Sequence, residues 1–359
     1  MKFEIAQRPI GGDAPVFIVA ELSCNHQQDF SLAVKTIRAM KEAGADAVKL
    51  STDWNDGGIT IDCDNRYFRI GEGTIWDGKT LFELYEEAFT PWEWQPKLKS
   101  LIEELGMVCF STATDTTAVD FLEGIDIPCY KIASFEINDL PLIEYAAAKG
   151  KPMIISTGVA TLSDIEAAVH ACRKAGNHRI ALLKATSAYP TPFREINLRT
   201  IPHLRSLCGT VVGLSDHSLG TSVAVAAVAL GAKVVEKHFI LERALGGPDA
   251  AFSMEPQEFR QMVQSIREVE QALGAVSYEI PEGVRRNRRF MKSLFAIRDI
   301  AAGEEFTGEN IRSIRPGDGL PPGFFPTLVG KKANRPIRRG TPLTWELLLG
   351  ASTPERCEG

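Results

Sequence analysis

Two histidines and a glutamate have the types and spacing of a metal site. His217 follows the apolar run 210–214, and Glu236 and His238 lie two residues apart in the next apolar run. Side chains two apart on a strand share a face, and neighbouring parallel strands lie about 4.8 Å apart. The three side chains are therefore predicted to converge. Two imidazoles and a carboxylate suit manganese, iron or zinc, with positions left for water and substrate.

The alternative is that these histidines are hydrogen-bonded polar residues without a metal. A single histidine would favour that alternative, since histidines are often partly buried for packing reasons. Here there are two, at adjacent strand ends, and each has a carboxylate nearby in sequence, Asp216 for His217 and Glu236 for His238. The pair therefore favours the metal site.

Two lysines interrupt strands that are otherwise apolar, Lys49 in Val-Lys-Leu and Lys131 in Tyr-Lys-Ile. A lysine is almost never fully buried without an anionic partner. One lysine could form a Schiff base after burial lowers its pKa. Alternatively, both clamp the phosphate and carboxylate of a small substrate, or pair with Glu21 or Glu236. Nearby hydroxyls favour the anion clamp, and they belong to Ser134, Thr186, Ser187 and Ser215.

These residues follow short apolar runs that read as buried parallel strands with amphipathic helices between them. The strands are expected at Val16–Ala20, Ala47–Leu50, Met107–Ser111, Cys129–Ala133, Met153–Ser156, Ile180–Lys184, Thr210–Leu214 and Val234–Phe239. The helices are expected at Ser31–Ala43, Pro91–Leu105, Asp115–Leu122, Leu140–Lys149, Leu162–Ala175 and Ser218–Leu230. Eight such units predict a (β/α)₈ TIM barrel. A doubly wound sheet is the alternative, but no GxGxxG follows the first strand.

In such a barrel the active site lies at the carboxyl ends of the strands, and almost every predicted strand ends in polar residues. They are Glu21, Asn25, His26, Lys49, Ser51, Thr52, Ser111, Thr112, Lys131, Ser134, Glu136, Thr157, Thr186, Ser187, Tyr189, Ser215, Asp216, His217, Glu236 and His238. The long connection from Ser51 to Leu81, with Trp54, Trp76 and several glycines, leaves this end and is predicted to be functional.

Composition bounds the remaining possibilities. The chain has 359 residues and a formal net charge of -6 with interspersed charges, which argues against a nucleic-acid partner. The first ten residues lack a secretory signal, and no apolar run is long enough to span a membrane. Seven cysteines form no CxxC pair, so neither a disulfide framework nor a zinc knuckle is indicated. We expect a cytoplasmic enzyme.

The pattern changes after the helix that ends near Leu273. A basic run at 283–289 reads as part of a linker, and short strands with a Pro/Gly-rich segment follow from Lys292. We predict a barrel domain at 1–275, a linker at 276–291 and a small β-rich domain at 292–359.

Several ordered motifs together resemble the sialic acid synthase family. They are Phe17–His26 with its A-E-x-x-x-N-H pattern, Lys131–Ser134, Ala185–Pro192, Gly213–His217 and Glu236–Phe239. The last domain, about 293–348, resembles the SAF (antifreeze-like) domain of these synthases and carries the R-P-G-x-G-[IL] signature at Arg315–Leu320. Within the family, Thr74–Asp77 and Leu81–Pro91 look closest to pseudaminic acid synthases.

The resemblance implies a condensation of phosphoenolpyruvate with an N-acetylated amino-sugar aldehyde to give a nonulosonic acid and phosphate. The implied acceptor is a 2,4-diacetamido-2,4,6-trideoxyhexose, and the alternatives are N-acetylneuraminate or legionaminic acid synthesis. It also implies a divalent metal, manganese or else magnesium, and a domain-swapped homodimer. Outside this class, a Schiff-base aldolase and a non-catalytic sugar-binding barrel remain alternatives.

Residue roles carried over from the resemblance place the metal on His217 and His238. Around phosphoenolpyruvate it implies Lys49, Thr112, Lys131, Ser134, Ser187 and Ser215, and near the sugar Glu21, Tyr189 and Asp249. Arg315 would reach the sugar from the partner subunit. Ser51, Glu136 and Asp216 are further expected substrate ligands at strand ends. Glu21 or Glu236 is the expected acid/base group, with Lys49 and Lys131 also catalytic.

The chain departs from the family's pattern where the substrates are expected to bind. Ser51 replaces a glutamine, Thr112-Ala113-Thr114 replaces Ser/Thr-Pro-Phe, and Ala250 replaces a histidine. The segment 53–58 is also unusual. These departures bear mainly on which sugar is accepted.

Overall fold

The computed structural model describes residues 1–53 and 58–350, and it divides into two compact units, Met1–Gly274 and Ala275–Gly359. The segment predicted as a linker, 276–291, groups with the second unit. Trp54 of the long connection and the tail after residue 350 lie outside the described residues.

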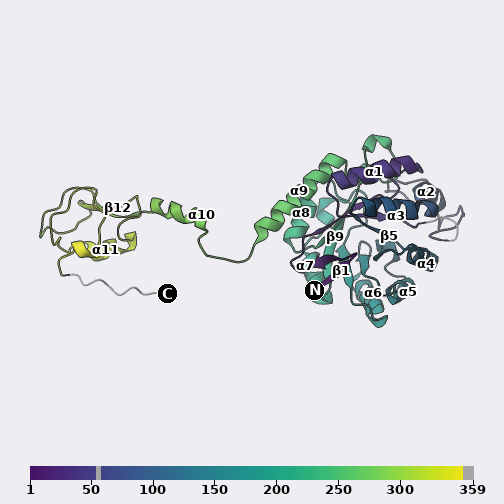
Figure 1. Cartoon of the computed structure of the whole chain (residues 1–359), viewed down its shortest axis with the longest axis horizontal. Helices are drawn as coiled ribbons and strands as arrows, with labels where there is room; N and C mark the ends of the chain where they lie inside the picture. The colour runs from purple at the N-terminus through teal and green to yellow at the C-terminus, as the bar shows by residue number, and fades with distance from the viewer. Residues whose placement is uncertain (54–57, 351–359) are drawn as a thin grey trace. The chain divides into compact units, whose positions relative to one another are not determined.

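The first unit is a closed barrel of eight parallel strands, which confirms the predicted fold (Figure 1). Around the barrel the order is β10-β3-β4-β5-β6-β7-β8-β9, so each strand pairs with the next along the chain and β10 closes onto β3. The strands are β3 Phe17–Glu21, β4 Ala47–Leu50, β5 Val108–Thr112, β6 Tyr130–Ile132, β7 Met153–Ser156, β8 Ile180–Lys184, β9 Val211–Asp216 and β10 Val234–His238. Nearly every residue of these strands is buried, as expected for strands covered on both faces.

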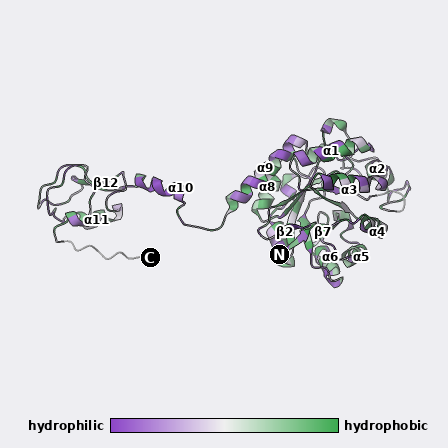
Figure 2. Cartoon of the chain, in the orientation of Figure 1, coloured by the Kyte–Doolittle hydropathy of each residue, from purple (hydrophilic) through white to green (hydrophobic). Residues whose placement is uncertain are grey.

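Helices alternate with the strands and cover the barrel (Figure 1). They are α1 Phe30–Glu42, α2 Leu81–Ala88, α3 Gln95–Glu104, α4 Thr116–Gly124, α5 Leu140–Ala148, α6 Leu162–Lys174, α7 Thr200–Cys208, α8 Ser222–Ala229 and α9 Pro256–Leu273. Short 3₁₀ segments are Trp92–Trp94, Ser134–Glu136, Phe193–Glu195, Arg243–Leu245 and Ala250–Phe252. The residues before α1 and α6, Asp29 and Thr161, cap their helices through side-chain oxygens. Figure 2 shows both hydrophobic and hydrophilic residues along α9, as expected for a helix with one buried face.

Two helices escaped the sequence prediction. The stretch before α2 reads as one long irregular connection, yet Thr80 and Glu83 form a capping box that starts the helix there. The second, α7, begins without a side-chain cap and ends at Gly209, whose φ of 56° lies in the left-handed region that favours glycine.

An N-terminal hairpin, β1 Lys2–Ile5 and β2 Arg8–Gly11, was also not predicted. It contributes Ile5 and Ile10 to the main apolar core of the barrel. Arg8 pairs with Asp46, which directly precedes β4 and therefore marks the amino ends of the strands. The same carboxylate accepts from Arg267 of α9 at 2.7 Å and from the backbone of Ile18 at 2.9 Å. One buried carboxylate thus ties hairpin, barrel and last helix together.

Replacing Asp46 should therefore destabilise the fold without touching the carboxyl ends of the strands. We expect Asp46→Ala to lower the free energy of unfolding by about 2 kcal/mol, because two arginines and an amide lose their acceptor. Chemical denaturation measures this. The exposed pair Asp64–Arg69 supplies the control, since Asp64→Ala should leave stability unchanged within error. An equal effect of the two substitutions would contradict the role of Asp46.

The second unit is a small β-rich domain, as predicted. Strands β11 Ser293–Ala296 and β12 Ile311–Ile314 pair antiparallel. Its core includes Leu294, Phe306 and Leu343. Short helical segments complete it, namely α10 Glu282–Arg285, Arg286–Phe290, Pro322–Phe324, α11 Phe325–Leu328 and Trp345–Leu347. Within the described residues of both units, no helix is long and apolar enough to cross a membrane. The cytoplasmic location stays a prediction.

Candidate active site

A pocket opens where the barrel strands end, and thirteen of the sixteen expected site residues line it. They are Glu21, Lys49, Ser51, Thr112, Lys131, Ser134, Glu136, Tyr189, Ser215, His217, Glu236, His238 and Asp249. The pocket collects side chains from all eight strands or the residues that follow them, so no short stretch of sequence could build it alone.

The carboxylate of Glu236 organises the floor of the pocket. Its Oε1 accepts from Lys131 at 2.9 Å, from Lys49 at 3.2 Å and from the hydroxyl of Ser215 at 2.9 Å. Glu236 and Lys131 are each only 1 % exposed. Burial alone would raise the pKa of Glu236, but the two lysines lower it well below its usual range. Glu236 is therefore ionised and holds two buried cations.

The two lysines differ in their surroundings. Burial lowers the pKa of Lys131, and the single carboxylate of Glu236 offsets this only in part. Lys49 has a second partner, Glu21, at 2.8 Å. Burial acts against its charge too, yet Glu21 and Glu236 together raise the pKa of Lys49 above its usual value. Lys49 is therefore the more firmly charged of the pair.

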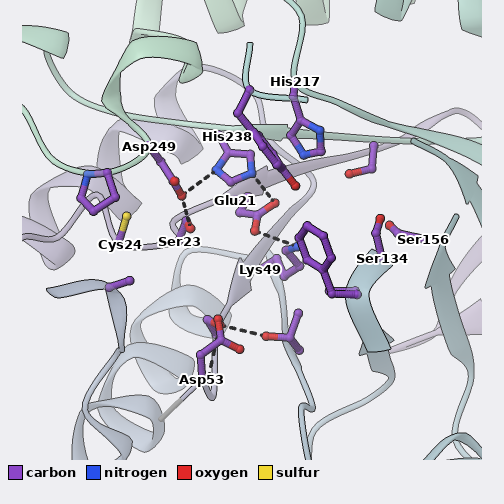
Figure 3. A pocket seen from close by; sticks show the side chains of 18 of the residues that line it. Glu21, Ser23, Cys24, Lys49, Asp53, Ser134, Ser156, His217, His238 and Asp249 are labelled. Atoms are coloured by element: carbon purple, nitrogen blue, oxygen red, sulfur yellow. Dashed lines mark hydrogen bonds and ion pairs between the residues drawn. The ribbon is translucent and has the colours of Figure 1, made fainter. Parts of the chain in front are cut away.

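A chain of contacts continues from Lys49 to the end of β10 (Figure 3). Glu21 Oε2 lies 3.3 Å from His238 Nε2, and His238 Nδ1 lies 3.3 Å from Asp249 Oδ2. Ser23 donates to the same oxygen of Asp249 at 2.5 Å. Burial would lower the pKa of His238, but the carboxylates of Glu21 and Asp249 raise it. Both ring nitrogens of His238 therefore face carboxylates.

His217 lies beside His238 with ring centroids 5.3 Å apart. Its Nδ1 lies 3.2 Å from the carbonyl oxygen of Thr186, so Nδ1 carries the proton and Nε2 keeps its lone pair. Burial, and next the charge of His238, lower the pKa of His217 to about 4. A neutral imidazole with a fixed tautomer is the form that binds a metal ion.

These residues fit a divalent ion whose coordination is completed from outside the protein. Within residues 1–53 and 58–350, no group of three or more His, Cys, Asp or Glu side chains is arranged to hold a metal by itself. The two imidazoles of His217 and His238 do meet, with Glu21 next to them. The sequence predicted Glu236 as a third metal ligand, and this stays a prediction. Its Oε1 accepts from the two lysines, while its Oε2 is buried without a hydrogen-bond partner among the described residues. Water and substrate would have to supply the remaining ligands.

Hydroxyl groups gather around Gly158, after β7. The Gly158 amide donates to Ser134 Oγ at 3.0 Å, and a Cβ at this position would lie 2.2 Å from Ser187 Oγ. Glycine is therefore required for the hydroxyls to approach. Ser156 Oγ and Ser187 Oγ are buried without a hydrogen-bond partner among the described residues. Ser156 lines the pocket together with Lys131, and a free hydroxyl donor in the same pocket as a lysine suits a small anion.

Three expected ligands do not line this pocket. The hydroxyl of Ser187 lies beside the position of Gly158 instead. Asp216 points the other way, because alternate residues of a strand face opposite sides, and it pairs with Lys237 at 2.7 Å. The structure therefore places Asp216 outside this pocket, and its role as a substrate ligand stays a prediction. Arg315 follows β12 in the second unit, and its approach to the sugar stays a prediction.

The pocket also contains residues that the strand-end rule missed, including Ser23, Cys24, Asp53, Trp76, Tyr85 and Ser156. Ser156 could have been found by alternation, since Thr157 beside it bonds to a backbone carbonyl at 3.1 Å instead. Trp76 comes from the long connection, where its indole donates to Pro248 O at 3.0 Å and its ring contacts Tyr189. Trp76 of this connection therefore lines the pocket, and the functional role of the connection stays a prediction.

The raised pKa of Glu136 leads to a prediction of how stability depends on pH. Burial, and next the charge of Asp53, raise the pKa of Glu136 from 4.5 to about 7. The native state therefore binds more protons than the unfolded state between these values, so stability falls as pH rises through this window. Glu136→Gln removes that loss. We expect the stability of the variant relative to the parent to increase from pH 5 to pH 8 in urea denaturation, and a constant difference would contradict the shift.

Comparison with known proteins agrees with the fold and its two parts. The NeuB family model matches residues 36–278, and the SAF domain model matches residues 292–349. Pseudaminic acid synthase of Helicobacter pylori is 43% identical over 331 residues, covering 92% of this chain and 97% of that protein. N,N'-diacetyllegionaminic acid synthase of Legionella pneumophila is 32% identical over 94% of this chain and 96% of its own length. The crystal structure of spore coat polysaccharide biosynthesis protein SpsE from Bacillus subtilis superposes with a TM-score of 0.66, at 35% identity over 98% of this chain and 100% of that chain.

Proposed function

Because the chain belongs to the NeuB family, we propose that it condenses phosphoenolpyruvate with an N-acetylated amino-sugar aldehyde, giving a nonulosonic acid and phosphate. The observation that carries the proposal is the pair of buried lysines held by Glu236 in the same pocket as two neighbouring imidazoles. The synthases to which the chain is similar support the class of reaction.

Phosphoenolpyruvate would bind at the lysine side of the pocket. Lys49 and Lys131 provide charge, and the free hydroxyl of Ser156 provides a donor for phosphate or carboxylate oxygens. These side chains would hold phosphoenolpyruvate so that its C3 faces the acceptor in one orientation. Such positioning lowers the barrier of a reaction between two substrates. Thr112, Ser134 and Ser215 would add hydroxyl contacts around the same molecule.

The aldehyde would lie beside His217 and His238, which would hold a divalent ion, manganese or else magnesium. Such an ion supplies Lewis-acid polarisation of the aldehyde oxygen. Glu21 lies between Lys49 and His238 and can take or give a proton at the new hydroxyl. C3 bonds to the aldehyde carbon, water adds to C2, and phosphate leaves with the bridging oxygen.

For the acceptor we propose a 2,4-diacetamido-2,4,6-trideoxyhexose, supported by the 43% identity to pseudaminic acid synthases. The legionaminic acid synthases, at 32% and 33% identity, support the alternative acceptor class less strongly. We further propose a domain-swapped homodimer in which Arg315 of a second copy reaches the sugar.

Phosphate release tests the reaction. With phosphoenolpyruvate and manganese, we expect release only when an acceptor is added, and faster release with the diacetamido-trideoxyhexose than with N-acetylmannosamine. Colorimetric phosphate detection and the product's mass measure this. Release without acceptor would contradict condensation, and no release with any acceptor would favour a non-catalytic sugar-binding barrel.

The two imidazoles give a separate prediction. We expect His217→Ala to weaken manganese binding at least about 100-fold, because half of the nitrogen ligands disappear. Manganese titration followed by electron paramagnetic resonance measures binding without turnover. His203→Ala, an exposed histidine of α7, is the matched control and should bind like the parent. Equal manganese binding by all three proteins would remove His217 from the metal site.

Burial lowers the pKa of Lys131, and this observation favours a Schiff-base aldolase instead. The Glu236 contact at 2.9 Å opposes it, since a carboxylate keeps the amine protonated. Borohydride treatment with pyruvate discriminates the two. We expect no mass increase, whereas a covalent adduct on either lysine, with activity retained under chelator, would support the aldolase.

A further inference from the structure

A buried ion pair lies directly beside the two imidazoles of the pocket in the sequence. Asp216 ends β9 and precedes His217, and Lys237 precedes His238 at the end of β10. Lys237 and Asp216 are also register partners where the two strands pair. Their side chains meet at 2.7 Å, and the two residues are only 0 % and 4 % exposed. The pair therefore joins the two strands at the residues that precede the imidazoles.

This ion pair lies on the face of the barrel wall that points away from the pocket. Side chains alternate along a strand, and Glu236 and His238 line the pocket, so Lys237 between them points outward. Its contacts are with Asp216 and with the turn that precedes α8, rather than with the groups of the pocket. Any effect of Lys237 on the site must therefore pass through the backbone of the two strands.

Lys237 holds the turn that follows His217. Its Nζ donates to Asp216 Oδ2 at 2.7 Å, to the carbonyl oxygen of Ser218, and to the carbonyl oxygen of Gly220 at 3.4 Å. An ammonium group has three N–H donors, and each has an acceptor here. One side chain of β10 thus binds the residues on both sides of His217.

Asp216 closes the same turn from the other side. Its Oδ1 accepts from the backbone amide of Ser218 at 2.9 Å and from the Ser218 hydroxyl at 2.7 Å. A bond from an aspartate to the amide two residues further on is an Asx-turn, and His217 is the residue inside it. The backbone of His217 is therefore fixed, while its ring is oriented separately by the carbonyl oxygen of Thr186.

A buried ion pair is weak evidence for a role in stability alone. The cost of taking both charges out of water is similar to the attraction between them, and apolar residues of similar size are often as stabilising. The bonds of such a pair are directional, however, so they specify one arrangement of the backbone. Here those of Lys237 and Asp216 converge on the turn that carries one imidazole.

We propose that Lys237 and Asp216 are positioning residues, which set the placement of His217 relative to His238 and thereby the affinity of the site for a divalent metal. Figure 3 shows the two imidazoles next to each other, and their ring centroids are 5.3 Å apart. Removing a residue that supports a metal ligand typically weakens metal binding about 10- to 100-fold. The inference rests on the proposed metal site, because it assigns what holds that site together.

The test removes both charges at once, in the double variant Asp216→Asn with Lys237→Met, so that neither charge stays buried alone. We expect circular dichroism to show the parent's fold, and manganese titration by electron paramagnetic resonance to show about 10-fold weaker binding. Asp46→Ala is the matched control, because it breaks a buried ion pair at the amino ends of the same strands. It should unfold more easily yet bind manganese like the parent.

A smaller change covers the case in which the double variant does not fold. Ser218→Ala removes one hydroxyl and with it one of the bonds to Asp216. We expect it to weaken manganese binding about 2-fold, in the same direction as the double variant. If the double variant does not fold, Ser218→Ala with parent-like manganese binding overturns the inference.

A readout without metal separates this inference from the proposed function. In the parent, Nδ1 of His217 faces the carbonyl oxygen of Thr186, so nitrogen-15 NMR of the rings should show one tautomer. The chain has six histidines, and the signal of His217 is the one missing in His217→Ala. We expect a mixture of tautomers in the double variant and a single one in Asp46→Ala.

Two results would overturn the positioning role when the parent binds manganese. One is parent-like manganese binding by the folded double variant, and the other is an equal loss of binding in Asp46→Ala. If the parent binds no manganese, the proposed metal site is wrong, and the tautomer of His217 then decides. A mixture in the double variant alone would still support the positioning role, and a single tautomer would overturn it.

Discussion

The shared carboxylate of Glu236 is the constraint on which the pocket depends. Two lysines in apolar strands cannot be buried as cations without an anion, and Glu236 serves both within 3.2 Å. The arrangement also holds three strands together that do not pair with one another, because Lys49, Lys131 and Glu236 come from β4, β6 and β10. A closed barrel is the fold that brings these distant strands to one centre.

The chemistry of the site follows from how that charge is distributed. Lys49 pairs with Glu21, and Glu21 also contacts His238. Burial keeps His217 neutral, and the carbonyl oxygen of Thr186 orients its ring. Positive charge and free hydroxyls therefore lie on one side, and neutral ligand nitrogen on another. A trianionic enol phosphate and a neutral aldehyde need these two environments side by side. This division explains why one pocket can serve two unlike substrates.

The sequence was informative about the strands and about many of the residues at their carboxyl ends. Apolar runs predicted all eight strands, and their polar ends predicted Lys49, Lys131 and the two histidines. The failures have two physical causes. Alternation by one residue decides the face, so Asp216 was assigned to the pocket and Ser156 was overlooked. Elements without strong periodicity were missed, namely the hairpin β1–β2, helices α2 and α7, and pocket residues such as Asp53 from the long connection.

The fate of the bridging oxygen of phosphoenolpyruvate tests the central claim most directly. Charged lysines that position the substrate for attack by C3, with water adding at C2, require cleavage of the bond between C2 and that oxygen. With oxygen-18 at the bridging position, the released phosphate should carry the label, as read by the isotope shift in phosphorus NMR. Unlabelled phosphate, formed by attack on phosphorus, would contradict condensation at this site.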